Sequence, residues 1–204
     1  MKKKFYVCSY GGSGSKMLCS YLMNFGKVWH IHSRRPPNKL TNIGTIDNSE
    51  WFNNQILDEQ SRSETKVLFI YRNPVDAILS RFYGSKHLRN IQTDPNITMD
   101  DVVKRKKDLY GITEFFDNYT KLDNKNYDIY CIKYEDFFDK IEELNELLGL
   151  SPTPNMYPIQ RETKYLWGTT KSKRYDLVEP LKEVYAELIQ EMEDMPFIKI
   201  NKRD

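Results

Sequence analysis

The 204-residue sequence has no long apolar run and few cysteines. No stretch reaches the roughly 20 consecutive apolar residues of a membrane-spanning helix, and the apolar segment 5–8, which follows three lysines, is too short for a secretory signal. The 3 cysteines form no C-x-x-C pair, and no Cys/His set has the spacing of metal ligands. We therefore expect a cytoplasmic protein with reduced, buried thiols, no bound metal and no transmembrane segment.

The sequence also has little net charge. Its 31 basic and 29 acidic residues leave a formal charge of +2, which argues against a nucleic-acid partner. Basic residues cluster only locally, at 34–35, 104–107 and 171–174, and the first two clusters are expected to be solvated faces. The length suits one domain over residues 1–204, and no repeat or linker divides the chain.

Short apolar segments with strand character alternate with segments of helical spacing. The expected strands are residues 5–9, 27–32, 66–71, 127–133 and 197–200, and the expected helices include residues 15–25, 50–61, 74–83, 135–148 and 176–192. This alternation predicts an α/β fold of three layers, with a central parallel sheet flanked by helices on both faces. Because ligands of such sheets bind at the carboxyl ends of the strands, the loops that follow the strands should surround one site.

A glycine-rich segment, SYGGSGSKML at residues 9–18, connects the first expected strand to the first expected helix. Glycines allow the backbone to curl so that its N–H groups point inward, and the helix start adds further free N–H groups and the positive end of its dipole. A loop of this kind binds phosphate. The candidate binding residues are Gly11, Gly12, Ser13, Gly14, Ser15 and Lys16.

The loop differs from the Walker A motif, G-x-x-x-x-G-K-[ST], in which lysine directly follows the last glycine. Here Ser15 lies between the last glycine and Lys16, and Met17 takes the place of the magnesium-binding hydroxyl. These differences disfavour a magnesium-dependent kinase. A kinase nevertheless stays the alternative enzyme, with Glu135 or Asp136 as its metal ligand.

The expected strand at residues 66–71 is followed by RNPVDAILSRF at residues 72–82. Together with the glycine-rich segment, this run resembles the sulfotransferase family. The family's first motif, Y-P-K-S-G-T-T-W-L, corresponds to residues 10–18, and its second motif, R-[ND]-P-x-D-x-x-x-S-x-[FY], matches residues 72–82 at each specified position. Residues 133–150 resemble the family's Y-E-D-L and F-L-G-L pattern, so the three motifs cover about three quarters of the chain.

The resemblance implies a sulfotransferase of P-loop NTPase-like fold that uses the donor 3′-phosphoadenosine 5′-phosphosulfate and requires no metal. The glycine-rich loop would hold the 5′-phosphosulfate, and Arg72 and Ser80 the 3′-phosphate, because a guanidinium meets phosphate oxygens in pairs. The plain alternative for Arg72 is an ion pair with Asp76. Tyr134 is a candidate neighbour of the adenine or else a core tyrosine, and Met17 replaces a tryptophan that often stacks there in the family. A basic loop that closes over the 3′-phosphate corresponds to Lys171, Lys173 and Arg174.

The resemblance also suggests His32 and Lys16 as the catalytic residues. In many members a histidine in a K-T-H-L-P-like stretch removes the acceptor proton, and His32 follows the second expected strand. His30 would share a strand face with it and is the reserve candidate, whereas other branches use a glutamate, for which Glu50 is the candidate. The position of the family's lysine is Gly12 here, so Lys16 would reach the phosphosulfate from the start of the helix.

The sequence therefore predicts a sulfotransferase that acts on a hydroxyl or amine of a small-molecule, sugar or lipid acceptor. The alternatives are a P-loop kinase and a non-catalytic nucleotide-binding or partner-binding relative, the latter suggested by Gly12. Residues 36–51, 85–96 and 152–167 are expected to wall the acceptor pocket, but their mixed side chains identify no acceptor. The sequence does not indicate an oligomeric state.

Overall fold

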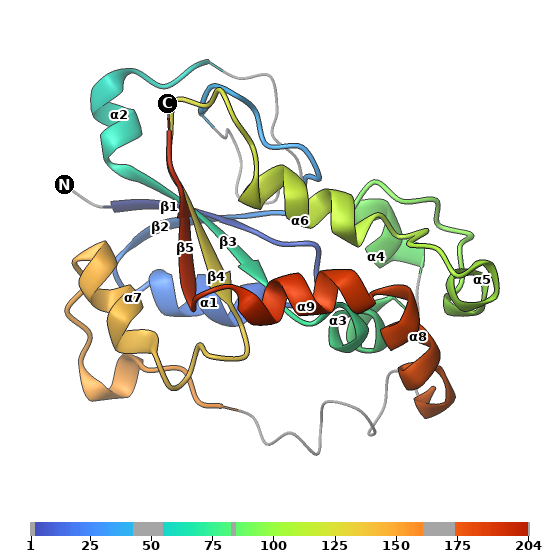
Figure 1. Cartoon of the computed structure of the whole chain (residues 1–204). Helices are drawn as coiled ribbons and strands as arrows, with labels where there is room; N and C mark the ends of the chain where they lie inside the picture. The colour runs from blue at the N-terminus through green and yellow to red at the C-terminus, as the bar shows by residue number, and fades with distance from the viewer. Residues whose placement is uncertain (1–2, 43–54, 83–84, 161–173, 204) are drawn as a thin grey trace.

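A computed structural model describes residues 3–42, 55–82, 85–160 and 174–203 of the chain. At its centre is a five-stranded sheet in the order β2-β1-β3-β4-β5 (Figure 1). The first four strands are parallel, and β5 joins the edge antiparallel to β4. The strands are β1 (Lys3–Cys8), β2 (Gly26–Ile31), β3 (Thr65–Tyr71), β4 (Ile129–Lys133) and β5 (Ile198–Asn201).

Helices cover both faces of the sheet, which confirms the predicted three-layer α/β fold (Figure 1). On one face α1 and α7 pack against Phe5 and Val7 of β1. On the other face α3, α5, α6, α8 and α9 contribute to one core with Cys8 of β1 and Phe69 of β3. The helices are α1 (Ser15–Leu22), α2 (Glu59–Ser63), α3 (Pro74–Arg81), α4 (Ser85–Asn90), α5 (Met99–Arg105), α6 (Ile112–Thr120), α7 (Ile141–Leu148), α8 (Val178–Val184) and α9 (Ala186–Asp194).

The central strand β3 is apolar on both faces because helices cover both. Its residues from Val67 to Tyr71 are completely buried, and successive side chains contribute to opposite cores. On the α6 side, the ring of Phe69 stacks on Tyr119 with a centroid distance of 4.6 Å. This packing fixes the end of β3, and therefore the position of the residues that follow it.

The edge strand β5 is held by side chains as well as by its pairing with β4. The side-chain amide of Asn201 donates to the backbone carbonyls of Tyr119 and Leu122 at 3.0 and 3.2 Å. The ammonium group of Lys125, a residue that is only 2 % exposed, donates to Asn201 Oδ1 at 2.8 Å and to the carbonyls of Leu122 and Lys202. A buried charge is tolerated there because three oxygens surround it.

Three expected helices differ in extent from the structure. In the described part of residues 50–61, Ile56 forms a β-bridge with Thr41, and α2 begins only at Glu59, where Asp58 caps it by accepting from the backbone N–H of Ser61. The helix expected from residue 135 begins at Ile141. The long helix expected over residues 176–192 is interrupted at Tyr185, whose buried hydroxyl hydrogen-bonds Asp108 at 2.7 Å.

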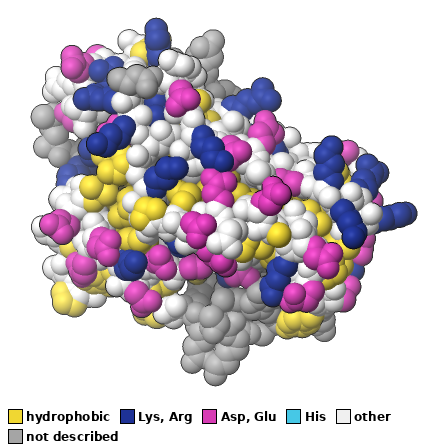
Figure 2. Space-filling model, in the orientation of Figure 1, with side chains coloured by type: hydrophobic (Ala, Val, Ile, Leu, Met, Phe, Trp, Pro, Cys, Tyr) yellow, Lys and Arg dark blue, Asp and Glu magenta, His cyan; other side chains and the backbone are white. Residues whose placement is uncertain are grey.

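The surface agrees with the low net charge. Basic and acidic side chains are mixed over the face in Figure 2, and Lys104 to Lys107 are exposed at the end of α5, as expected. Among the described residues, no helix is both long and apolar enough to cross a membrane.

The strand order creates a topological switch point at one edge of the sheet. The chain passes from β1 to β2 on one side and then crosses to β3 on the other side of β1. The carboxyl ends of β1 and β3 therefore flank the topological switch point, where open α/β sheets bind their ligands. Residues 9–14 leave β1 at this point, and Arg72 leaves β3 beside them.

Candidate functional site

The glycine-rich loop between β1 and α1 forms a tight cradle. Gly11, Gly12 and Gly14 have φ angles of 88°, 71° and 79°, in the left-handed region that favours glycine. A Cβ atom on Gly12 would lie 2.7 Å from the carbonyl oxygen of Ala77 in α3, and one on Gly14 would collide with the ring of Tyr134. A larger residue at either position would collide with α3 or with Tyr134, so the loop conformation requires glycine there.

The start of α1 leaves donors at the edge of this cradle. Gly14 occupies the N-cap position without any side-chain cap, so the first N–H groups of α1 keep the positive end of the helix dipole. The hydroxyls of Ser13 and Ser15 are buried beside the loop, and Lys16 is exposed at the first turn. Free N–H groups at a helix start attract anions, so the phosphate site that the sequence predicts stays a prediction for this loop.

Arg72 at the end of β3 connects three parts of the site. Its side chain is 6 % exposed, and its guanidinium donates to the carbonyl of Gly12 at 3.3 Å and to Asp76 at 3.1 Å. The guanidinium also lies over the ring of Tyr134, 4.8 Å from the centroid. The ion pair with Asp76 is therefore present, but it is largely buried at the switch point rather than on the surface.

Arg72 keeps one donor for a further partner. Its Nε is buried and has no hydrogen-bond partner among the described residues. Burial raises the pKa of the Asp76 carboxyl even though the Arg72 charge opposes that rise. A buried guanidinium with an unused N–H next to a glycine cradle is suited to an anion with several oxygens.

The loops after β3 and β4 are locked to each other. The carboxylate of Glu135 accepts from the backbone N–H of Asn73 at 2.8 Å, and Asn73 in turn caps α3 by accepting from the N–H of Val75. The backbone N–H of Tyr134 donates to the carbonyl of Tyr71 at 2.9 Å. Glu135 thus already has a structural partner, and burial raises the pKa of its carboxyl. The described residues contain no group of three His, Cys, Asp or Glu side chains that could hold a metal ion.

Two histidines at the end of β2 face the same loop, as their spacing predicted. Their ring centroids are 4.2 Å apart, His30 Nε2 lies 2.8 Å from Ser15 Oγ, and His32 Nδ1 lies 2.7 Å from the carbonyl oxygen of Ser9. A carbonyl only accepts, so His32 carries its hydrogen on Nδ1 and presents an unprotonated Nε2.

The surroundings of the two histidines favour their neutral forms. Burial lowers the pKa of His30 to about 3, and the charges of His32, Lys16 and Arg81 add to this effect. Burial likewise lowers the pKa of His32, with further lowering by Arg81 and Lys16, although the hydrogen bond to Ser9 opposes it. Sequence reasoning missed Arg81, which occupies a variable position of the R-[ND]-P-x-D motif.

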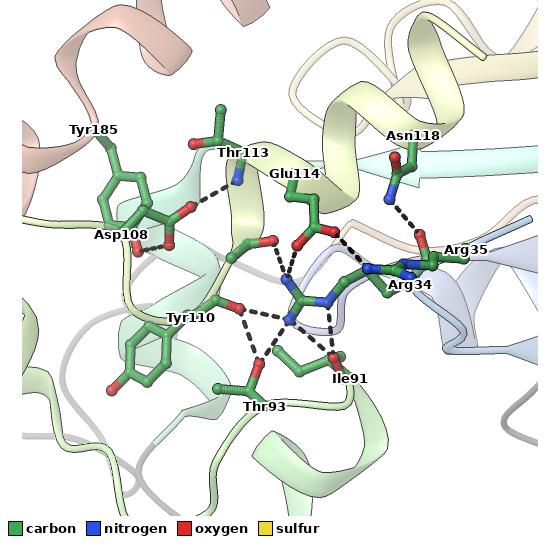
Figure 3. A network of polar contacts seen from close by, with 11 residues as sticks. Arg34, Arg35, Ile91, Thr93, Asp108, Tyr110, Thr113, Glu114, Asn118 and Tyr185 are labelled. Carbon is green, nitrogen blue, oxygen red and sulfur yellow. Dashed lines mark hydrogen bonds and ion pairs between the residues drawn. The ribbon is translucent and has the colours of Figure 1, made fainter. Parts of the chain in front are cut away.

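Arg34 anchors the segment that carries His32, and its expected place on a solvated face is wrong. It is 8 % exposed and lies in the network of Figure 3. Its guanidinium donates to Thr93 and Glu114 at 2.7 and 3.0 Å, and to three backbone carbonyls, those of Ile91, Tyr110 and Gly111. The burial follows from the fold, because α6 and the loop before it close over this segment.

For the other predicted site residues, no hydrogen bond or ion pair with the glycine-rich loop is seen in the described part of the chain. Ser80 lies one turn beyond Asp76 on α3 and is half-buried. Arg174 binds Asp100 at the start of α5 with N–O distances of 2.7 and 2.8 Å, and also binds Asp176. Glu50, Lys171 and Lys173 lie outside the described residues, as do parts of the segments expected to wall the acceptor pocket.

A doubly wound sheet with a glycine-rich loop at its switch point places the chain in the class of open α/β folds. Comparison with protein families is more specific: the sulfotransferase domain model matches residues 52–166, and the chain belongs to this family of transferase enzymes. The match includes the Arg72 motif and the Tyr134 segment, whereas the glycine-rich loop precedes it. No curated protein matches the chain.

Proposed function

We propose that the protein transfers a sulfuryl group from 3′-phosphoadenosine 5′-phosphosulfate to a hydroxyl or amine of a small acceptor. The observation that carries this proposal is the meeting of the glycine cradle, the buried Arg72 and the unprotonated Nε2 of His32 at the switch point. Membership of the sulfotransferase family supports the reaction type.

The residues at the switch point fit a donor of this kind. The donor carries a phosphosulfate and a separate phosphate. In this proposal the glycine-rich loop and Arg72 are the two anion-binding elements, and the hydrogen bond from Arg72 to the Gly12 carbonyl joins them. In this proposal the loop N–H groups and the hydroxyls of Ser13 and Ser15 bind the phosphosulfate. Arg72, through its unused Nε, binds the 3′-phosphate together with Ser80.

Tyr134 and Met17 are the proposed neighbours of the adenine. Both approach Gly14, since a Cβ atom there would meet the Tyr134 ring and would lie 3.5 Å from the methyl carbon of Met17. The ring of Tyr134 also supports the Arg72 guanidinium. Tyr134 thus joins the two anion-binding elements, and this contact is a more specific role than filling the core.

His32 is the proposed general base. Its Nδ1–H is held by the Ser9 carbonyl and no described residue hydrogen-bonds its Nε2, whereas Nε2 of His30 is already occupied by Ser15. The acceptor oxygen or nitrogen bonds to sulfur as the bond from sulfur to the bridging phosphate oxygen breaks. The acceptor proton passes to His32 Nε2, and the bisphosphate leaves with the bonding electron pair.

The test is calorimetric binding of 3′-phosphoadenosine 5′-phosphate without magnesium, compared with ATP plus magnesium. We expect the wild type to bind the bisphosphate, and Arg72→Ala to weaken that binding by about tenfold to a hundredfold, because a hydrogen bond to a charged group is lost. Arg72→Lys keeps a partner for Asp76 and shows whether the loss persists in a folded variant. Arg105→Ala, an exposed arginine at the end of α5, is the matched control.

Three results would contradict the proposal. Preference for ATP with magnesium would favour the kinase, and absence of binding by either nucleotide would favour a non-catalytic relative. Equal bisphosphate affinity in the wild type and both Arg72 variants would remove Arg72 from the site.

A further inference from the structure

The proposed reaction requires a cation beside the glycine-rich loop, and position 12 does not supply one. Sulfuryl transfer, like phosphoryl transfer, moves negative charge onto the leaving oxygen, which a nearby cation must stabilise. Position 12 has no room for a charged side chain, because Ala77 already contacts the backbone there. Arg72 is adjacent, but Asp76 largely neutralises it. Two other cationic side chains near the loop are those of Lys16 and Arg81.

Arg81 lies on the side of α3 that faces the loop. Two contacts join α3 and the residue after it to the loop. A Cβ atom on Gly12 would meet the backbone of Ala77, and one on Gly11 would lie 3.9 Å from the ring of Phe82. Arg81 is four residues beyond Ala77, and residues at this spacing lie on the same side of a helix. It is half-buried, and no hydrogen bond or ion pair engages it in the described part of the chain.

The electrostatics of the histidine pair agree with this placement. After burial, the charges of Arg81 and Lys16 are among the effects that lower the pKa of both His30 and His32. Arg81 from α3 and Lys16 from α1 therefore approach the histidines from two different helices. Both side chains are cationic, and a cationic surrounding suits a negatively charged ligand.

We infer that Arg81 is a further catalytic residue, which binds the sulfuryl oxygens of the donor and supplies the positive charge that Gly12 cannot carry. This inference rests on the proposed function and deepens it. Lys16 is flexible and exposed at the first turn of α1, whereas the planar guanidinium of Arg81 is half-buried and can hold two oxygens at once.

A plainer role for Arg81 is stabilisation of the α3 dipole, because it lies in the last turn of that helix. Arg105 occupies the equivalent place in α5 and is exposed. Arg81→Gln and Arg105→Gln thus remove the same charge from the same helical position. Only the first removes it beside the glycine loop, which makes Arg105→Gln the matched control.

The experiment compares two probes by calorimetry, 3′-phosphoadenosine 5′-phosphosulfate and the bisphosphate that lacks the sulfuryl group. Arg81→Gln should weaken binding of the phosphosulfate by at least about tenfold, the usual effect of losing a charged hydrogen bond, and should change bisphosphate affinity less than about twofold. Arg81→Lys should restore part of the loss. Arg105→Gln should leave both affinities unchanged, and thermal unfolding should confirm that all variants fold.

The outcomes separate this inference from the proposed function. Unchanged phosphosulfate affinity in Arg81→Gln overturns the inference alone, and so does an equal loss for both probes, which would mean that Arg81 acts through the fold. A wild type that binds neither probe overturns the proposed function, and the inference with it.

Discussion

Gly12 and Gly11 offer a test of how tightly the loop is held. Both have positive φ, but only a Cβ on Gly12 meets backbone atoms, at 2.7 Å from Ala77 O, whereas one on Gly11 meets only the Phe82 ring at 3.9 Å. Both alanine variants carry backbone strain of about 1–3 kcal/mol. We expect Gly12→Ala to lower the free energy of unfolding by about 1–3 kcal/mol more than Gly11→Ala does, because overpacking adds to the strain.

Urea denaturation of the two variants measures this difference. Equal losses would show that the contact between Gly12 and Ala77 does not constrain the loop. A lysine at position 12 should cost at least as much as alanine, since its Cβ meets the same atoms. The family's lysine therefore cannot simply be restored here.

Single residues were predictable where their local sequence determines their conformation. The three loop glycines were recognised from their spacing behind a strand, and each has positive φ. Arg34 and Arg81 were not recognised, because their positions depend on contacts with distant segments. Arg34 looked like half of a surface pair, yet its partners lie 57 to 80 residues further along the chain.

At the scale of elements, Arg34 holds the segment after β2 against α6. Replacing Arg34 with methionine removes the donor to the Ile91 carbonyl and to the Thr93 oxygen (Figure 3). The Tyr110 and Gly111 carbonyls keep a donor each, from Thr93 and Phe115. Leaving a buried polar group without its hydrogen-bond partner typically costs about 1–3 kcal/mol. We expect Arg34→Met to lower the free energy of unfolding by about that amount.

The neighbouring arginine is the control for this prediction. Arg35 is 80 % exposed, and the N–O distance of its ion pair with Glu114 is 3.5 Å. Arg35→Met should change stability by no more than about 0.5 kcal/mol, as surface substitutions do. Chemical denaturation measures the free energy of unfolding of both variants. Similar losses in the two would show that Arg34 does not hold the segment after β2 against α6.

Helix ends were predictable where a cap is local and not where a tertiary contact sets them. Thr98 and Asp101 form a capping box at α5, and Gly149 ends α7 with φ of 59°. The break between α8 and α9 falls at Tyr185, whose hydroxyl donates to Asp108, 77 residues earlier in the chain. No periodicity in residues 176–192 reports that contact.

For the whole molecule, the histidine pair predicts how stability depends on pH. The pKa of His30 falls to about 3 in the folded state, and that of His32 is also lowered, so between these values and about 6.5 the unfolded chain binds more protons. Their contribution is complete above about pH 6.5 and is lost as pH falls. Asp76 and Glu135, with raised pKa values, act in the opposite direction at lower pH.

We therefore expect the free energy of unfolding of the wild type to rise between pH 5 and pH 7. In the double variant His30→Gln, His32→Gln this rise should be smaller, and the carboxyl contributions cancel in the comparison. Urea denaturation at several pH values measures the slope. An identical slope in both proteins would show that the histidines titrate alike in the folded and unfolded chains.

The fold class was predictable from the alternation of strands and helices, but the strand order was not. Alternation is local, whereas the placement of β1 between β2 and β3 depends on packing of segments far apart in the chain. The switch point, and with it the meeting of Arg72 and the glycine loop, follows only from that order. Lys171, Lys173 and Glu50 remain predictions, since they lie outside the described residues.

The late position of β5 has a consequence for synthesis on the ribosome. The other four strands of the sheet are complete once residue 133 has been translated, but the free edge of β4 gains its partner only after residue 201. Until then β4 exposes unpaired N–H and C=O groups beside apolar Tyr130 and Ile132, a template for pairing with other nascent chains. Chaperone dependence during translation should therefore end with the emergence of the last strand, and stalling before Ile198 should leave an aggregation-prone intermediate.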